Sequence, residues 1–236
     1  MDKPYPIPGD VNIPLYWIRP QEILSGASGS HRFTWDQHYA PLDVPASYPI
    51  SATNGQTTPD FTSPWALPGN YTVKLTVDGT STSQPLKIVM DPRVKTSTAD
   101  LVTQHDLSLT CYQNRIQLLV ALEESGRLRE QIKSALPNAK GDVAAQLGTT
   151  DQVLAKMESS SRGIAPPNLG RLSGIFGSLL NIFQETEMPA TTQGKAGVTE
   201  AQGQFDKVMF EWKNWKEKDL VKLNKQLKQA GLKELK

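Results

Sequence analysis

The proline residues divide this chain into two parts that must fold differently. Thirteen of the 17 prolines lie before residue 93, and the other four are scattered through the rest of the 236 residues. Proline removes a backbone donor and breaks helix interiors, so the first part cannot form long helices. The second part has long proline-free intervals. We therefore place a boundary near residues 91–95 and expect two small domains rather than one large one.

The proline-rich part has the alternation that is typical of β-strands. Residues 71–77 are apolar at odd positions and polar at even positions, which predicts one buried and one solvated face. Asp78-Gly79 then supplies a tight hairpin turn, and residues 81–90 return as the partner strand. Residues 15–18 and 31–35 are further strand candidates. Several short strands at this spacing predict a β-sandwich of the immunoglobulin or fibronectin type, wrapped by a long loop over residues 40–65.

The second part changes to a helical period. Apolar stripes predict helices over residues 97–136, 142–157, 169–185 and 199–227, with a loop at 188–197. In the first helix, one apolar face can follow Leu101, His105, Leu109, Tyr112, Ile116 and Leu119. The predicted fold class is therefore α+β in two domains. An extended arm (1–13) precedes the β-sandwich (14–95), and an antiparallel bundle of about four helices (96–236) follows.

Composition excludes several kinds of partner and framework. A net charge of +1 gives no long-range attraction to nucleic acid, and one cysteine cannot form an internal disulfide. No apolar run is long enough to span a bilayer, and the N-terminus lacks a signal peptide. Residues 206–236 carry nine lysines and five acids, a local charge of +4. A solvated helix face is favoured there over contact with a membrane surface.

Any catalytic reading begins with the histidines, and Asp36 and His38 form the best pair. In a strand their side chains share one face, so they could form an acid–base dyad or hold a metal. The favoured structural alternative is that His38 hydrogen-bonds a loop while Asp36 caps a turn. Cys111 has apolar neighbours on a predicted helix and is expected to be a buried, inert thiol. The sequence contains no nucleophile elbow, phosphate-binding loop or zinc-protease motif.

Calcium is the one cofactor that the sequence suggests, since loop carboxylates can supply its oxygen ligands without a linear motif. The candidate metal ligands are Asp36, His38, Asp43 and Asp60. A bound calcium could be structural, or it could polarise an ester or lactone carbonyl. The pocket for such a reaction is expected in the sandwich or between the two domains.

Five segments occur in an order that resembles a known bacterial family. They are residues 17–20 (WIRP), 31–39 (HRFTWDQHY), 48–52 (YPISA), 65–79 (WALPGNYTVKLTVDG) and 90–95 (MDPRVK). Together they resemble the C-terminal region of large secreted proteins described as glycosyl-hydrolase-like or sortilin-like. In that family a propeller of neuraminidase-type repeats comes first, and this sequence has no such repeats. The resemblance therefore implies a truncated tail, extracytoplasmic relatives and no glycosidase site in these residues.

Two functions follow from these observations. The first is an accessory or interaction module, which could contact carbohydrate or protein through Trp17, Trp35, Tyr39 or Trp65. The alternative is a small calcium-dependent hydrolase of esters or lactones, such as acyl-lactones, with Asp36 and His38 activating water. The sequence does not decide between them, and it does not fix the localisation of this chain.

Overall fold

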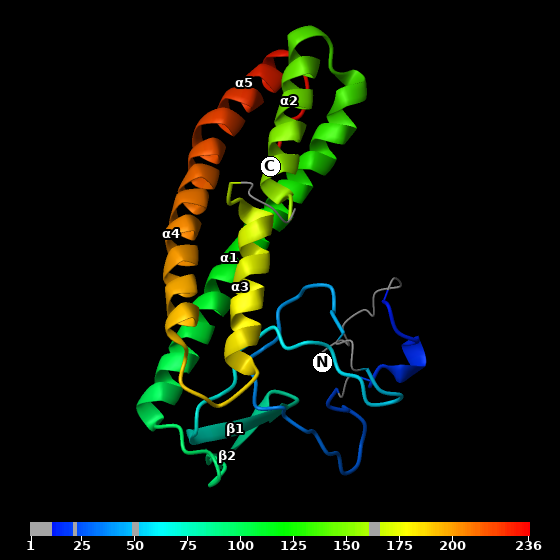
Figure 1. Cartoon of the computed structure of the whole chain (residues 1–236). Helices are drawn as coiled ribbons and strands as arrows, with labels where there is room; N and C mark the ends of the chain where they lie inside the picture. Colours follow the sequence, from blue (N-terminus) through cyan, green and yellow to red (C-terminus); the bar gives the residue numbers. More distant parts are fainter. Residues whose placement is uncertain (1–10, 21–22, 49–51, 161–165) are drawn as a thin grey trace. The chain divides into compact units, whose positions relative to one another are not determined.

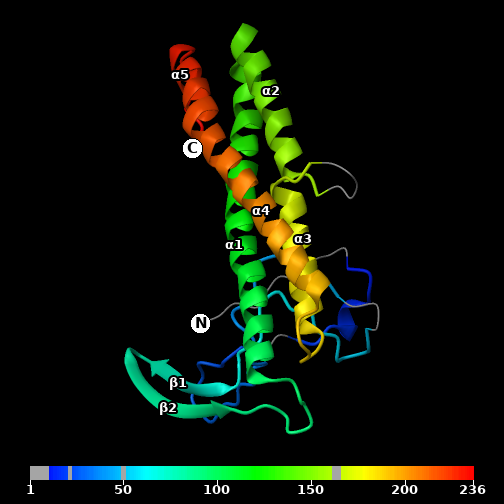
Figure 2. The same cartoon turned by 60° about the vertical axis from the view of Figure 1, so that its left-hand side comes forward.

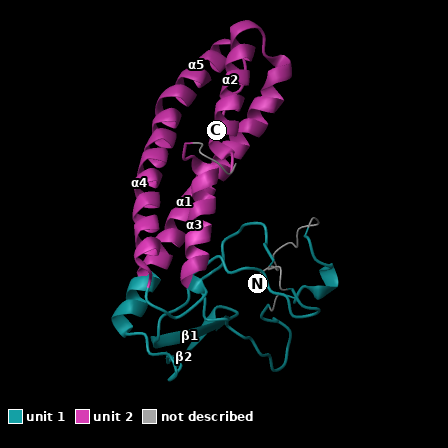
Figure 3. Cartoon of the chain, viewed as in Figure 1, with its two compact units in different colours: residues 1–105, 184–189 teal, residues 106–183, 190–236 magenta. Residues whose placement is uncertain are grey.

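A computed structural model describes residues 11–20, 23–48, 52–160 and 166–236 of the chain (Figure 1). The described residues are 54% helical, and they hold a single two-stranded sheet. The chain divides into unit 1 (residues 1–105 and 184–189) and unit 2 (residues 106–183 and 190–236), which Figure 3 colours separately. The predicted fold class, a β-sandwich followed by a bundle, is therefore wrong.

The strongest predicted strand pair is present in unit 1. Strands β1 (Gly69–Val77) and β2 (Thr80–Ile88) pair antiparallel, with Val77 opposite Thr80. Asp78 and Gly79 join them with φ angles of 49° and 80°. Two successive positive φ angles are typical of the tight turn that follows the twist of a hairpin. The hairpin prediction is confirmed, and it rested on local sequence alone.

A sandwich does not form because no second sheet covers this hairpin within the described residues. The apolar side chains that alternation marked for burial, Val73, Leu75 and Val77, are 51%, 49% and 57% exposed. Of the other strand candidates, residues 15–17 form a short 3₁₀ helix and residues 31–35 form no strand. Alternation reveals an apolar strand face but says nothing of what packs on it. The β-sandwich and immunoglobulin-like assignments are therefore wrong.

Outside the hairpin, unit 1 is held by short bridges between loops. Ile18 pairs with Thr57 in a parallel bridge, and His38 pairs with Trp65 in an antiparallel one. Both bridges tie the N-terminal segments to the proline-rich stretch at residues 52–66. Few aliphatic side chains are buried in the described part of this unit, namely Ile18, Leu42 and Leu101.

The second half of the chain forms long helices. They are α1 (Thr98–Ala135), α2 (Gly141–Glu158), α3 (Leu169–Gln184), α4 (Thr192–Trp215) and α5 (Val221–Gln229). A π-helical segment, Lys216–Leu220, joins α4 to α5 without a break. Helix α1 begins in unit 1, where the Ser97 hydroxyl accepts the N–H of Asp100, and continues into unit 2. These helices occupy the four stretches that the helical period predicted.

Two details of the helical part differ from the predictions. Helix α4 starts inside the predicted loop at 188–197, because the Thr191 hydroxyl accepts the N–H of Gly194 at 3.0 Å and caps it. In Figures 1 and 2, α2 and α3 run down the length of α1 one after the other, and α4 and α5 run up again. Helices α1 and α4 are therefore parallel, not antiparallel.

The face that α1 buries in unit 2 is displaced from the predicted stripe. The buried residues include Cys111, Leu118, Ala121 and Leu128, whereas Ile116 is 37% exposed. The face that α1 buries also contains polar residues, which a search for apolar periodicity does not count. Asn114 donates to the Gln202 amide oxygen at 2.6 Å, and Ser125 donates to Glu158 at 2.7 Å. Buried polar groups with partners are tolerated in a core, so the seam follows geometry rather than hydropathy.

Candidate functional site

The predicted pair, Asp36 and His38, lies together in a tight turn of unit 1. Asp36 Oδ1 accepts the main-chain N–H of His38 at 3.0 Å, which is the hydrogen bond of an Asx turn. Gln37 between them has a φ of 65°, in the left-handed region. The His38 ring lies 3.0 Å from the Asp36 carbonyl through Nδ1, which therefore donates. The carboxylate is farther from Nδ1, at 3.7 Å.

Aromatic rings bury the imidazole of His38, whose side chain is only 4% exposed. The ring stacks on Phe61 with centroids 3.9 Å apart and planes within 7°, and its edge meets Trp65 at 5.6 Å. This burial lowers the pKa of His38 below 6.5, and the nearby Asp36 charge opposes the shift only in part. His38 is therefore neutral at pH 7, with its proton on Nδ1.

This geometry limits what the pair can do. Nε2 of His38 is sealed from solvent and has no hydrogen-bond partner among the described residues, so it cannot reach a substrate in this conformation. The Asp36 side chain is 61% exposed, and its carboxylate hydrogen-bonds the main chain of His38 rather than the imidazole. These contacts are those of the structural alternative, a capped turn and a loop-bound histidine. The catalytic role of Asp36 and His38 stays a prediction.

The predicted calcium ligands do not converge in the described part of the chain. No group of three or more histidine, cysteine, aspartate or glutamate side chains is placed there to hold a metal ion. Asp43 is exposed, and Asp60 is half-buried, with its main-chain N–H donating to the Ser47 carbonyl at 2.8 Å. The structure thus brings together Asp36 and His38 but not three of the four candidates. Metal binding by these residues stays a prediction.

The aromatic residues proposed for carbohydrate contact are only partly accessible. Trp35 and Tyr39 are each 40% exposed, and Trp17 and Trp65 are half-buried. The Trp35 indole donates to the His38 carbonyl at 2.8 Å, and its ring meets Tyr71 edge-on at 6.3 Å. These contacts place Trp35 at a loop junction rather than in a sandwich core.

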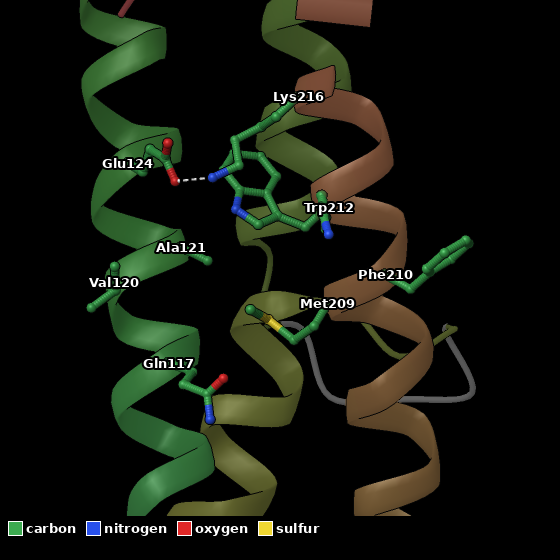
Figure 4. A pocket seen from close by; sticks show the side chains of 9 residues that line it. Gln117, Val120, Ala121, Glu124, Met209, Phe210, Trp212 and Lys216 are labelled. Carbon is green, nitrogen blue, oxygen red and sulfur yellow. Dashed lines mark hydrogen bonds and ion pairs between the residues drawn. The ribbon is translucent and has the colours of Figure 1, made fainter. Parts of the chain in front are cut away.

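A groove on unit 2 is a second candidate site, which the sequence did not indicate. It lies between the parallel helices α1 and α4 and has a volume of about 450 Å³ (Figure 4). Its lining is mainly apolar, with charged groups from both helices. The lining residues are Gln117, Val120, Ala121, Glu124, Met209, Phe210, Trp212, Lys213 and Lys216.

Polar and aromatic contacts fix the upper end of this groove. Lys216 Nζ lies 2.7 Å from a Glu124 carboxylate oxygen and 5.3 Å from the centroid of the Trp212 ring. Trp212 stacks on Trp215 with centroids 5.4 Å apart. Trp212 belongs to the core of unit 2, and Trp215 packs against that core. The π-helical segment starts at Lys216, directly above the groove. Segments of π-helix inside α-helices occur frequently at functional sites.

Side-chain size and direction open the groove. Ala121 is 2% exposed, and its small side chain leaves a depression that Figure 4 shows between it and Met209. Val120 and Phe210 point outward on opposite flanks and are 58% and 65% exposed. The signal that could have found this site is the pair of apolar residues that lie off the buried stripes of α1 and α4. Without the pairing of the two helices, such residues look like isolated exceptions.

Two further predictions can be compared with the structure. Cys111 is fully buried, and burial raises the pKa of its thiol to about 12, so the prediction of an inert cysteine is confirmed. Among the helices that the structure describes, none combines the length and apolar character needed to cross a lipid bilayer.

Comparison with known proteins gives no match: no protein-family model, no curated protein and no solved structure is similar to this chain.

Proposed function

We propose that this chain is an accessory or interaction module and that it binds a protein partner through the groove between α1 and α4. The observation that carries this proposal is the exposure of Val120 and Phe210 on the two flanks of one apolar depression. Isolated exposed apolar residues are common on proteins, but a contiguous apolar depression rimmed by charged groups is typical of an interaction site. The accessory role agrees with the family resemblance of residues 17–95.

Unit 2 suits a binding role because its groove is already formed. The ion pair of Glu124 with Lys216 and the stack of Trp212 on Trp215 hold its walls without any ligand. A site that is rigid before binding loses less conformational entropy when a partner docks. The groove holds no nucleophile with an adjacent general base, so binding is supported better than catalysis there.

Site-specific photo-crosslinking tests this proposal. A photoreactive phenylalanine analogue at Gln117, which lines the groove, is expected to give a discrete adduct in an extract of the source cells. The same analogue at Ile182, 53% exposed on α3, is the matched control and should give none. Val120→Asp and Phe210→Asp should abolish the adduct while leaving the helical circular dichroism unchanged. An adduct that survives both substitutions, or no adduct at Gln117, would contradict docking in this groove.

Hydrolysis is a second candidate function, and it requires a conformation in which Nε2 of His38 is uncovered. Nε2 of His38 is a buried acceptor without a partner in the described residues, and such an atom requires an explanation, such as a water or an ion. The test is turnover of ester and acyl-lactone substrates with and without chelator, in the native chain and in Asp36→Ala and His38→Ala. Activity of the native chain that is lost with chelator, in Asp36→Ala and in His38→Ala would support a metal-dependent hydrolase. No turnover over a broad panel would exclude it.

A further inference from the structure

We infer that Gln131 and Asn224 form a binding site for an extended peptide that carries a leucine, and that residues 235–236 of this chain occupy it. The site lies in unit 2 and shares no residue with the lining of the α1–α4 groove, so it does not depend on the function proposed above. Its support comes from hydrogen bonds to two consecutive backbone units and from the burial of a single leucine between them and the core.

The chain reverses direction directly after α5 and runs back along the bundle (Figures 1 and 2). The main-chain N–H of Gly231 donates to the Lys228 carbonyl at 3.1 Å, and that of Leu232 donates to the Leu227 carbonyl at 2.9 Å. These two hydrogen bonds form the Schellman motif that ends a helix, and Gly231 has the positive φ, 72°, that the motif favours. The residues that follow therefore run back beside α5.

Two side-chain amides pair with consecutive residues of this segment in the manner of a β-ladder. Asn224 of α5 accepts the main-chain N–H of Leu235 at 2.8 Å and donates to the Leu235 carbonyl at 2.9 Å. Gln131 of α1 does the same for Lys236, with both hydrogen bonds at 2.8 Å. Each amide thus satisfies both backbone groups of one residue, as a neighbouring strand would. Such pairing recognises an extended peptide backbone, whatever its sequence.

One side chain of the bound residues supplies the selectivity. Leu235 is 3% exposed and belongs to the core cluster of unit 2, whereas Lys233, Glu234 and Lys236 are exposed. Leu232 serves the end of α5 instead, because it packs on the same cluster in the position where a Schellman motif makes its apolar contact. The class of ligand is therefore an extended peptide in which a leucine is followed by one further residue of any type.

The bound segment can leave this site without unfolding a helix. Residues 232–236 belong to no helix or strand, and Gly231 separates them from α5. A segment with few buried apolar contacts opens at a much lower free energy than the core does. The open site presents two unpaired side-chain amides and the space that Leu235 filled, which suits the same chemistry supplied by another chain. Residues 235–236 are thus an occupant in cis that closes the site to other peptides.

Amide hydrogen exchange in the full-length chain tests the backbone pairing. The main-chain amides of residues 235–236 are expected to exchange slowly, and Asn224→Ala and Gln131→Ala should each accelerate them. Asn181→Ala and Gln113→Ala are the matched controls, since they remove the same side-chain types from exposed positions of α3 and α1. Unprotected amides in the native chain, or no acceleration in either site variant, would overturn the inference.

Binding in trans is tested with a fluorescent, acetylated peptide of residues 230–236 (AGLKELK) and fluorescence anisotropy. Leu235→Asp in the full-length chain keeps its own segment out of the site, because burial of a carboxylate is costly, so this variant should bind the peptide. The native chain should bind it roughly tenfold more weakly or less, since its site is open for only a fraction of the time. No binding to a Leu235→Asp chain with native circular dichroism would contradict the inference.

Modified peptides separate backbone recognition from burial of the leucine alone. A methyl group on the main-chain nitrogen of Leu235 removes the donor to Asn224 and should weaken binding by roughly tenfold. Leu235→Ala in the peptide should abolish binding, whereas serine in place of Lys233 and Glu234 should leave the affinity unchanged. Equal binding of the methylated and unmethylated peptides would refute recognition of the backbone.

The native chain provides a further test that needs no substitution. Unlabelled peptide at millimolar concentration competes with a segment tethered by a short linker. It should displace the segment and accelerate exchange at the Leu235 amide of the chain, and the peptide with Leu235→Ala should not. Unchanged exchange at that concentration would refute a replaceable occupant, whether or not the Leu235→Asp variant folds.

Discussion

The two units of this chain differ most in what they bury. Twenty buried apolar residues form one contiguous cluster in unit 2, whereas Ile18, Leu42 and Leu101 are the buried aliphatic residues described in unit 1. Burial of apolar surface is the main favourable term in folding, at roughly 25 cal/mol per Å². Unit 2 can therefore rely on its core. Unit 1 must rely on turns, loop bridges and aromatic contacts that are individually weak.

This difference shows why the two units provide different kinds of candidate site. A dense core fixes the helix surfaces, so a groove on unit 2 keeps its shape without a ligand. Unit 1 instead positions His38 through one turn, a hydrogen bond of its ring to the Asp36 carbonyl, and ring contacts with Phe61 and Trp65. Four measurements test this contrast between the two units.

The largest effect is expected from removing a central ring of the unit 2 core. Phe176 is fully buried and meets Phe205 edge-on at 6.0 Å. Phe176→Ala should lower the free energy of unfolding by about 3–5 kcal/mol, through lost burial and a cavity. Urea unfolding followed by circular dichroism at 222 nm measures this. Leu42→Ala in unit 1 is the counterpart and should cost less, and an equal cost would contradict the contrast between the units.

The next largest loss of stability is expected from breaking the ion pairs between α1 and α2. Arg129 donates to Asp151 at 2.8 Å and to Glu158 at 2.6 Å, and all three side chains are about three-quarters buried. Arg129→Ala leaves the two carboxylates facing each other, which should cost about 1–3 kcal/mol. The exposed pair of Arg127 with Glu123 provides the control. Arg127→Ala should cost under about 0.5 kcal/mol in the same urea titration. Similar losses in the two variants would refute the role of burial here.

The same Gly→Ala substitution should have opposite signs in the two units. Gly79 has a φ of +80° in the hairpin turn, so Gly79→Ala strains the backbone and should cost about 1 kcal/mol. Gly203 lies inside α4, and a Cβ added there would meet no atom within 4 Å, so Gly203→Ala should stabilise by about 0.5–1 kcal/mol. Amide hydrogen exchange in β1 and in α4 reports each effect locally. Destabilisation of both regions would contradict this reading of the turn.

The smallest effect should be a pH dependence confined to unit 1. The pKa of His38 is lower in the folded chain than its unfolded value of 6.5, so the unfolded state binds more protons. The contribution of His38 to stability is complete above pH 6.5 and is lost as the pH falls below it. Exchange in β1 and in the loop around Trp65 should therefore accelerate between pH 6.5 and 5, after correction for intrinsic rates.

His38→Gln should remove this dependence, and His31→Gln, at an exposed position, should not. Acceleration that persists without His38 would assign the pH dependence to other groups.

One of the two candidate sites could be predicted from the sequence, and the other could not. Asp36 and His38 were predicted as a pair because they are two residues apart, and a single turn is enough to bring them together. The groove needed the pairing of α1 with α4, whose lining residues are about 90 positions apart in the chain. No local sequence pattern indicates that Phe210 and Val120 lie on the same surface. The buried face of α1 was predicted on the wrong residues for a related reason. Asn114 and Ser125 are buried because they bond to partners on other helices.

Local sequence set the secondary-structure elements of this chain. Pro137 follows the end of α1, Asp78-Gly79 set the hairpin turn, and the helical period located the stretches that form α1 to α5. These features depend on backbone sterics and near-neighbour contacts, which a single chain segment contains. Tertiary packing set three further features: no second sheet covers the hairpin among the described residues, α1 and α4 run parallel, and a groove lies between them. Those outcomes depend on which distant apolar surfaces meet, and burial energy is non-directional, so no local pattern encodes the choice.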